Sequence, residues 1–164
     1  MKIGIISDTH DHHANALAAV ELFNKLAVKY VLHAGDIVSP FTAKVFGNID
    51  KARFIAVYGN NDGEKLLLKQ VIGDFGGEIH ENCFKGNIAQ KKIFMTHTHY
   101  FIEEVVVGGE YDLVVYGHTH KQDIRWVNGT MVVNPGEATD WLTGTPQVLI
   151  LDLGTMEHDI IPLA

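Results

Sequence analysis

Short apolar runs rich in β-branched residues recur along the chain, and they constrain the fold more than any other feature. Each run is only a few residues long and is followed by polar residues, which is the pattern of a strand buried on both faces. The five runs cover residues 2–7, 30–33, 53–58, 92–96 and 113–116. The chain therefore predicts a sheet that other elements cover on both sides.

Helical patterns separate the early runs. The first has apolar residues on one helical face, at Ala16, Val20, Phe23 and Ala27. Helices are predicted over about residues 13–28, 39–46, 62–73 and 100–107. Ser39-Pro40 opens the second, and Asp62 is a candidate cap of the third, although it also matches an acidic residue of the relatives described below. The alternation of strand and helix predicts right-handed crossovers and a mostly parallel sheet in the first half of the chain.

The second half has the pattern of antiparallel hairpins. Residues 123–127 and 131–134 flank Asn128-Gly129, and Asn-Gly is a strong signal for a tight hairpin turn. A second hairpin is predicted over residues 83–88 and 91–96, and further strands over residues 147–153 and 158–161. The fold class is therefore α/β, and 164 residues without a visible linker predict a single domain over residues 1–164.

Charge and composition narrow the partners and the compartment. The formal net charge of −7 argues against non-specific binding to nucleic acid, which needs a basic surface. The single cysteine, Cys83, excludes an internal disulfide. No apolar run is long enough to span a membrane, and the opening run is too short for a signal peptide. We expect a cytoplasmic protein.

Metal-binding residue types follow every one of the five runs. The segments are Asp8-Thr9-His10, Gly35-Asp36, Gly59-Asn60-Asn61-Asp62, His97-Thr98-His99 and Gly117-His118-Thr119-His120. Because the carboxyl ends of parallel strands share one edge of a sheet, where ligands bind, these segments are expected to meet. The glycines before the polar residues allow a close approach of the backbone.

Seven of these side chains are candidate metal ligands: Asp8, His10, Asp36, Asn60, His97, His118 and His120. Mixed oxygen and nitrogen donors suit Mn, Fe, Ni or Zn. Seven donors exceed what one open site needs, so they predict two ions that share one carboxylate. Asp8 and His10 lie two apart on an extended chain, so their side chains are expected to point the same way, as are those of His118 and His120.

The other histidines have simpler interpretations. His33 lies within an apolar run and is expected to be a buried, hydrogen-bonded residue. Surface or capping roles are expected for the remainder outside the motif segments: His12, His13, His80 and His158.

The ordered set of Asp8-x-His10, Gly35-Asp36, Gly59-Asn60, His97 and Gly117-His118-x-His120 resembles the calcineurin-like metallophosphoesterase superfamily. The short chain, its opening strand and Asn134-Pro135-Gly136 resemble the small single-domain phosphodiesterases of bacteria and archaea. The resemblance implies a four-layer α/β/β/α sandwich of two mixed β-sheets. It also implies that one ion is held by Asp8, His10, Asp36 and His120, and the other by Asp36, Asn60, His97 and His118.

The resemblance further implies a dinuclear site that hydrolyses phosphodiester bonds with a bridging water or hydroxide, and manganese is the expected metal. Many relatives have a histidine where this chain has Asn61, and an amide cannot act as a general acid. His99, two residues after His97, is the candidate to replace it.

Other functions stay open at this level. The same fold serves phosphomonoesterases and phosphoprotein phosphatases, and in the small retromer subunit it serves as a protein-binding scaffold. Complete ligand positions favour an enzyme acting on a small phosphodiester. Substrate choice is expected to depend on residues 98–110 and 137–146, and an exposed Trp126 or Trp141 can serve a partner. A homo-oligomer also stays open.

Overall fold

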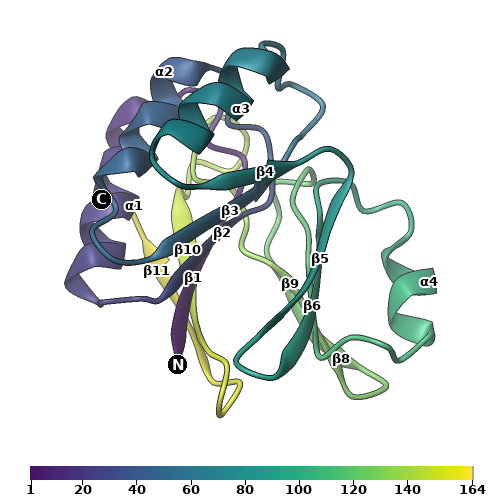
Figure 1. Ribbon diagram of the computed structural model, residues 1–164. Coiled ribbons are helices and arrows are strands. Elements are labelled where there is room, and N and C mark those ends of the chain that lie inside the picture. Colours follow the sequence, from purple (N-terminus) through teal and green to yellow (C-terminus); the bar gives the residue numbers. More distant parts are fainter. Residues whose placement is uncertain (164) are drawn as a thin grey trace.

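Two mixed β-sheets face one another in the computed structural model, which describes residues 1–163 (Figure 1). The strand orders are β11-β10-β1-β2-β3-β4 in the first sheet and β5-β6-β7-β9-β8 in the second. Helices cover the outer face of each sheet, three on the first and one on the second. The predicted α/β sandwich of two mixed sheets is confirmed.

The first sheet combines parallel strands from the beginning of the chain with antiparallel strands from its end. The parallel strands are β1 (Lys2–Ile6), β2 (Tyr30–His33), β3 (Arg53–Val57) and β4 (Glu78–His80). β10 (Gln147–Asp152) and β11 (His158–Pro162) continue the sheet beyond β1. The short β4 has no recognisable pattern in the sequence.

The second sheet contains the two predicted hairpins. Its strands are β5 (Cys83–Ile88), β6 (Lys91–Thr96), β7 (Leu113–Val115), β8 (Asp123–Val127) and β9 (Thr130–Asn134). β5 with β6 and β8 with β9 are antiparallel, whereas β6, β7 and β9 run parallel. The polar segments after β6 and β7 therefore leave the same edge of this sheet.

The helices are α1 (His13–Lys25), α2 (Pro40–Ala43) continued by the 3₁₀ turn η1 (Lys44–Asn48), α3 (Lys65–Asp74) and α4 (Ile102–Val107). α1 ends before its predicted limit because Ala27 has a left-handed φ of 51°. The prediction that Asp62 caps the third helix is wrong, since Glu64 precedes α3 and the carboxylate of Asp62 binds elsewhere.

Three apolar cores hold the layers together. The central core lies between the sheets and joins Ile5, Leu32 and Ile55 to Ile93 and Val115. The second fills the space between α1–α3 and the first sheet, and the third lies between α4 and the second sheet. Each fully buried aliphatic side chain contributes about 1.5–3 kcal/mol. The cores therefore fix the two strand-end edges relative to each other.

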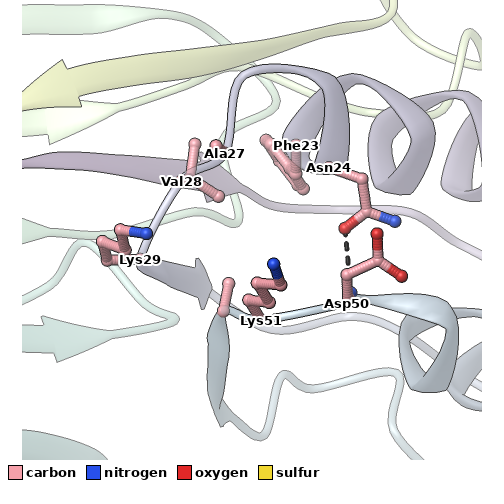
Figure 2. Close-up of a pocket in the computed structure, with 8 residues that line it drawn as sticks. Phe23, Asn24, Ala27, Val28, Lys29, Asp50 and Lys51 are labelled. Atoms are coloured by element: carbon pink, nitrogen blue, oxygen red, sulfur yellow. Dashed lines mark hydrogen bonds between the residues drawn. The ribbon is translucent and has the colours of Figure 1, made fainter.

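A small pocket of about 120 Å³ lies where β2 and β3 begin (Figure 2). The side chain of Asn24 lines it, and its Oδ1 accepts a 3.0 Å hydrogen bond from the backbone N–H of Asp50. This pocket is at the edge opposite the polar segments, so it lies away from the edge where open α/β sheets bind ligands. Among residues 1–163, no helix is long and apolar enough to cross a membrane.

Candidate metal centre

The loops that follow β1, β2, β6 and β7 are joined by backbone hydrogen bonds. The N–H of Asp8 donates to the carbonyl of Gly35 at 3.0 Å, and that of His10 donates to the carbonyl of Asp36 at 3.0 Å. The N–H of Gly117 donates to the carbonyl of His97, also at 3.0 Å. The backbone N–H of His118, after β7, donates to Oδ2 of Asp8, after β1, at 3.1 Å. Segments from both sheets therefore meet at one edge, as the strand-end argument predicts.

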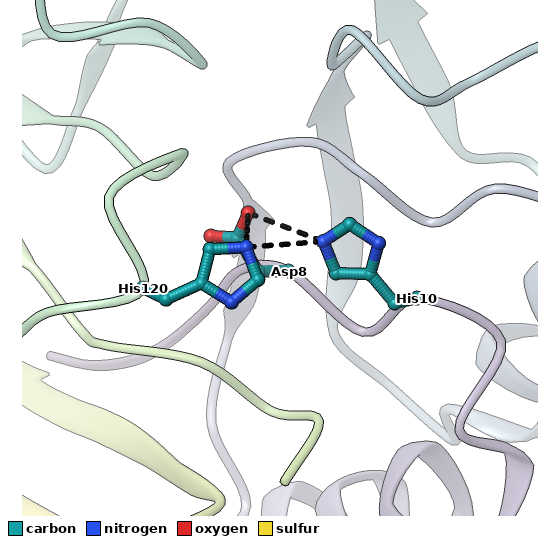
Figure 3. Close-up of side chains that lie close together, drawn as sticks. All are labelled: Asp8, His10 and His120. Atoms are coloured by element: carbon teal, nitrogen blue, oxygen red, sulfur yellow. Dashed lines mark hydrogen bonds and ion pairs between the residues drawn. The ribbon is translucent and has the colours of Figure 1, made fainter. Parts of the chain in front are cut away.

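One cluster of donors consists of Asp8, His10 and His120 (Figure 3). The Nε2 atoms of the two histidines lie 3.2 Å apart. The Oδ1 of Asp8 lies 3.7 Å from Nε2 of His10 and 3.5 Å from Nε2 of His120. All three side chains are buried. Three donor atoms from two sheets thus point at one small volume.

A second cluster lies beside the first and contains His97, Asn60 and His118. The Nδ1 of His97 donates to the carbonyl of Ala34 at 2.7 Å, so its Nε2 is free to face Oδ1 of Asn60 at 3.0 Å. The Nδ1 of His118 lies 2.8 Å from the same Asn60 oxygen.

Asp36 connects the two clusters. Its Oδ2 lies 3.5 Å from Nε2 of His10 in the first cluster and 3.3 Å from Nε2 of His97 in the second. Its carboxylate is almost completely buried, and the backbone N–H of Asn61 donates to its other oxygen at 2.8 Å. One carboxylate is therefore within reach of both donor groups.

The protein alone does not satisfy this arrangement. Within the described chain, Oδ1 of Asp8 is buried and accepts no hydrogen bond. The Nε2 of His97 faces an amide oxygen and a carboxylate oxygen, and a neutral ring protonated at Nδ1 has no proton to give them. An unpaired buried acceptor is costly, and a bound cation would satisfy both the oxygen of Asp8 and the nitrogen of His97. The donor set fits metal ions.

The pKa values of the buried histidines and of Asp36 are shifted by the same crowding of carboxylates and imidazoles. Burial acts to lower the pKa of His97 and of His10, but the neighbouring aspartates outweigh it and raise both. Burial acts to raise the pKa of Asp36, but His97 and Asn61 outweigh it and hold this pKa well below its usual range. The site thus favours positive charge between its carboxylates.

Backbone strain is concentrated in the same segments. Five of the candidate donors have a left-handed φ: Asp8 at 53°, His10 at 41°, Asp36 at 58°, His118 at 69° and His120 at 59°. Non-glycine residues seldom adopt this conformation, and such strain is concentrated at functional sites.

The left-handed backbone also corrects one sequence prediction. Because the chain is not extended here, the rings of His118 and His120 do not point the same way and enter different clusters.

Glycine is needed where the loops cross. A Cβ on Gly59 would overlap the carboxylate of Asp36, and one on Gly117 would overlap the hydroxyl of Ser7. The predicted close approach of the backbone is thus present at both positions.

Comparison with known proteins agrees with this geometry. The calcineurin-like phosphoesterase superfamily domain matches residues 1–156. The chain belongs to this superfamily. A phosphodiesterase of Methanocaldococcus jannaschii is 45% identical over 166 residues, which cover 99% of each protein. The members of this superfamily are hydrolytic phosphoesterases, and the resemblance drawn from the motifs is confirmed.

Solved structures show the same fold. The structure of an archaeal phosphodiesterase has a TM-score of 0.94 and 44% identity, covering 99% of this chain and all of that one. A structure of Vps29 from Entamoeba histolytica has a TM-score of 0.72 over the full length of both chains. At 19% identity, the second likeness concerns the fold alone.

Glu137 is a residue of this phosphoesterase that the motifs did not identify. Its side chain is buried, and its Oε2 lies 2.6 Å from Nδ1 of His120. A carboxylate at Nδ1 holds the proton there and turns the lone pair of Nε2 toward Asp8. Glu137 directly follows Asn134-Pro135-Gly136 at the end of β9, which was the available signal.

Asp62 binds the backbone of two loops that contribute donors to the metal centre. Its carboxylate accepts the backbone N–H groups of Gly59 and Val38, both at 2.6 Å, and of Asp36 at 3.2 Å. Burial raises the pKa of Asp62, and the charge of Asp36 adds to this shift, against the effect of its backbone donors. Asp62 thus joins the loops after β2 and β3 instead of capping a helix.

Asn61 and His99 both lie at the edge of the centre. The side-chain amide of Asn61 donates to Oδ2 of Asp36 at 2.8 Å. The exposed ring of His99 stacks on His118, with 5.5 Å between the centroids. His33 and His12 have the expected ordinary roles: burial lowers the pKa of His33 to about 3, and His12 caps α1.

We expect Glu137→Gln to weaken metal binding by about 10- to 100-fold, the range for residues that orient a metal ligand. The amide has one oxygen to offer both His120 and the backbone of Thr143. Calorimetric titration of the chelated protein with Mn²⁺ measures the affinity. Thr143→Val is the control, because it removes a contact to Glu137 but leaves His120 paired. An equal loss in the control would contradict an orienting role.

Proposed function

We propose that this protein is a metal-dependent phosphodiesterase that hydrolyses small phosphodiesters with two divalent ions. The observation that carries the proposal is the convergence of aspartate and histidine donor atoms from both sheets, with Oδ1 of Asp8 buried and unpaired among the described residues. Oδ2 of Asp36 lies within 3.5 Å of a histidine nitrogen in each cluster. The relative of 45% identity, named a phosphodiesterase, supports the diester as substrate. The single cysteine is compatible with a reducing cytoplasm.

Two sets of residues would hold the ions. The first set is Asp8, His10, Asp36 and His120, and the second is Asp36, Asn60, His97 and His118. The position of Oδ2 of Asp36, within 3.5 Å of a histidine nitrogen in each cluster, supports its role as the shared ligand. Mixed carboxylate, amide and imidazole donors favour manganese, with nickel, iron or zinc as alternatives.

The ions would supply an activated water and neutralise charge on the phosphoryl group. The protein contributes the positions of the donor side chains. Glu137 orients His120, Asp62 fixes the backbone at Asp36, and Ala34 fixes the ring of His97. These contacts preset the geometry, so little reorganisation is needed when a substrate binds.

Asn61 and His99 are the candidate groups that act on the ester. Asn61 already donates to Asp36 and can hydrogen-bond a phosphoryl oxygen, but its amide has no acidic proton. His99 is exposed beside His118 and is the candidate acid for a leaving alkoxide.

Removal of the ions is the test of the proposed function. We expect the chelated protein to lose diester hydrolysis and to unfold at a lower temperature, because ligands that bind the native state stabilise it. Adding Mn²⁺ should restore both properties. Assays on a diester, a monoester and a phosphopeptide then rank the substrate classes, with the diester fastest. Hydrolysis of diesters at the original rate by the stripped protein would contradict the proposal.

We expect Asp36→Asn to deplete both ions, whereas Asp8→Asn depletes mainly one. The reason is that Oδ2 of Asp36 lies within 3.5 Å of a histidine nitrogen in each cluster, whereas the histidines paired with Asp8 both belong to the first cluster. Metal analysis of the purified variants measures the number of ions bound per chain. Two tightly bound ions in Asp36→Asn would rule out the shared carboxylate.

The leaving group tests His99. We expect His99→Ala to slow hydrolysis of alkyl diesters by about 10²-fold or more and nitrophenyl diesters much less, because nitrophenolate leaves without a proton. Asn61→His should reduce the difference between the two substrates. His158→Ala, at an exposed histidine near the start of β11, is the control. Equal slowing of both substrates by His99→Ala would exclude an acid role.

A further inference from the structure

An exposed indole lies next to the metal centre. Trp141 has 66% of its surface exposed, yet its ring centroid lies 5.7 Å from that of His10, with a 30° tilt between the planes. The next residue, Leu142, is 72% exposed. Such apolar surface beside a polar centre is available to an apolar part of a bound molecule.

The chain on both sides of Trp141 is held in place. Before it, Oδ1 of Asp140 lies 3.7 Å from Nε2 of His12. After it, the backbone N–H of Thr143 donates to the buried Glu137 at 2.6 Å, and that of Leu142 donates at 3.3 Å. Since Glu137 also contacts His120, the loop and the metal centre share one anchor. The indole is therefore presented by an ordered segment, which lowers the entropy lost on binding.

A second exposed aromatic ring lies beside the other cluster. Tyr100 is 64% exposed, and its ring lies 6.0 Å from that of His118. His10 and His118 belong to different clusters, so an exposed aromatic ring stands beside each. A phosphodiester held by both clusters would therefore have an exposed aromatic ring beside each cluster.

We propose that Trp141 determines substrate choice by stacking on an aromatic ring carried by one ester arm of the phosphodiester. The ring belongs to a nucleobase or to an aryl ester, and both offer the flat face that an indole binds. This assignment rests on the proposed phosphodiesterase function, because it places the phosphoryl group at the metal centre.

The chain contains a matched control. Its other tryptophan, Trp126, is 57% exposed. It lies in β8, one residue before the turn into β9, and faces Met131 of β9 across the strand pair. That turn is at the opposite end of β9 from Asn134 and Glu137. Trp126 thus has the same side chain and similar exposure, but it lies away from the metal centre.

Phosphonates test the proposal without turnover, because their phosphorus–carbon bond is not an ester. The Mn²⁺-loaded protein is titrated with methylphosphonate, phenylphosphonate and an acyclic adenine phosphonate. We expect at least one ring-bearing phosphonate to bind about fivefold or more tightly than methylphosphonate, in line with stacking on an aromatic side chain. A gain for both indicates any aryl group, and a gain for the adenine compound alone indicates a nucleobase.

The variants show whether Trp141 is the cause. Trp141→Ala should abolish the advantage of the ring, Trp141→Phe should keep most of it, and Trp126→Ala should keep all of it. In Trp126→Phe, where Trp141 is the sole indole, a ring-bearing phosphonate should quench the fluorescence more than methylphosphonate does. An unchanged advantage in Trp141→Ala, or no advantage in the unaltered protein, would overturn the proposal.

This outcome is separable from that of the proposed function. If the Mn²⁺-loaded protein hydrolyses diesters but shows no ring preference through Trp141, only the stacking assignment fails. If it hydrolyses no diester, the proposed function itself fails.

Discussion

Buried acceptor atoms without donors are the constraint on which the rest of this structure depends. Asp8 has an unpaired carboxylate oxygen, and the lone pair of His97 faces two further acceptors. Neutral protein groups cannot satisfy such an arrangement, and leaving it unsatisfied costs several kcal/mol, on the order of 1–3 kcal/mol for each group. Positive charge is required, which explains both the raised pKa of His97 and the fit to metal ions.

The remainder of the fold holds these atoms together against strain and repulsion. Five donors have a left-handed backbone, which costs on the order of 1–3 kcal/mol at each position. The central core between the sheets and the hydrogen bonds between the loops supply the opposing stability. Glu137 and Asp62 then set the orientation of His120 and of the backbone at Asp36. Anchoring by Glu137 extends to the loop of Trp141, so metal binding and the proposed recognition of substrate share a support.

Local patterns predicted most of the fold. Apolar runs identified β1, β2 and β3, and Asn128-Gly129 identified the turn between β8 and β9, because these features are encoded by adjacent residues. Three-residue β4 has too few residues to show a pattern. Asp62 was misassigned for a related reason: an aspartate before a helix can serve as a cap, but here three backbone N–H groups from two loops bind it instead. Those donors are not visible from its neighbours in the chain.

The sequence by itself determined which residue types stand at the strand ends, and therefore the chemistry that the site can perform. Only the tertiary structure decided how the donors divide into two clusters. His118 and His120 are two residues apart, but their left-handed backbone sends one ring to Asn60 and the other to Asp8. Likewise, Glu137 gains its place through His120, 17 residues away in the chain, and Trp141 through His10, more than a hundred residues away. Residue type follows from the sequence directly, whereas direction and distance depend on backbone strain and packing between segments that are remote in the chain.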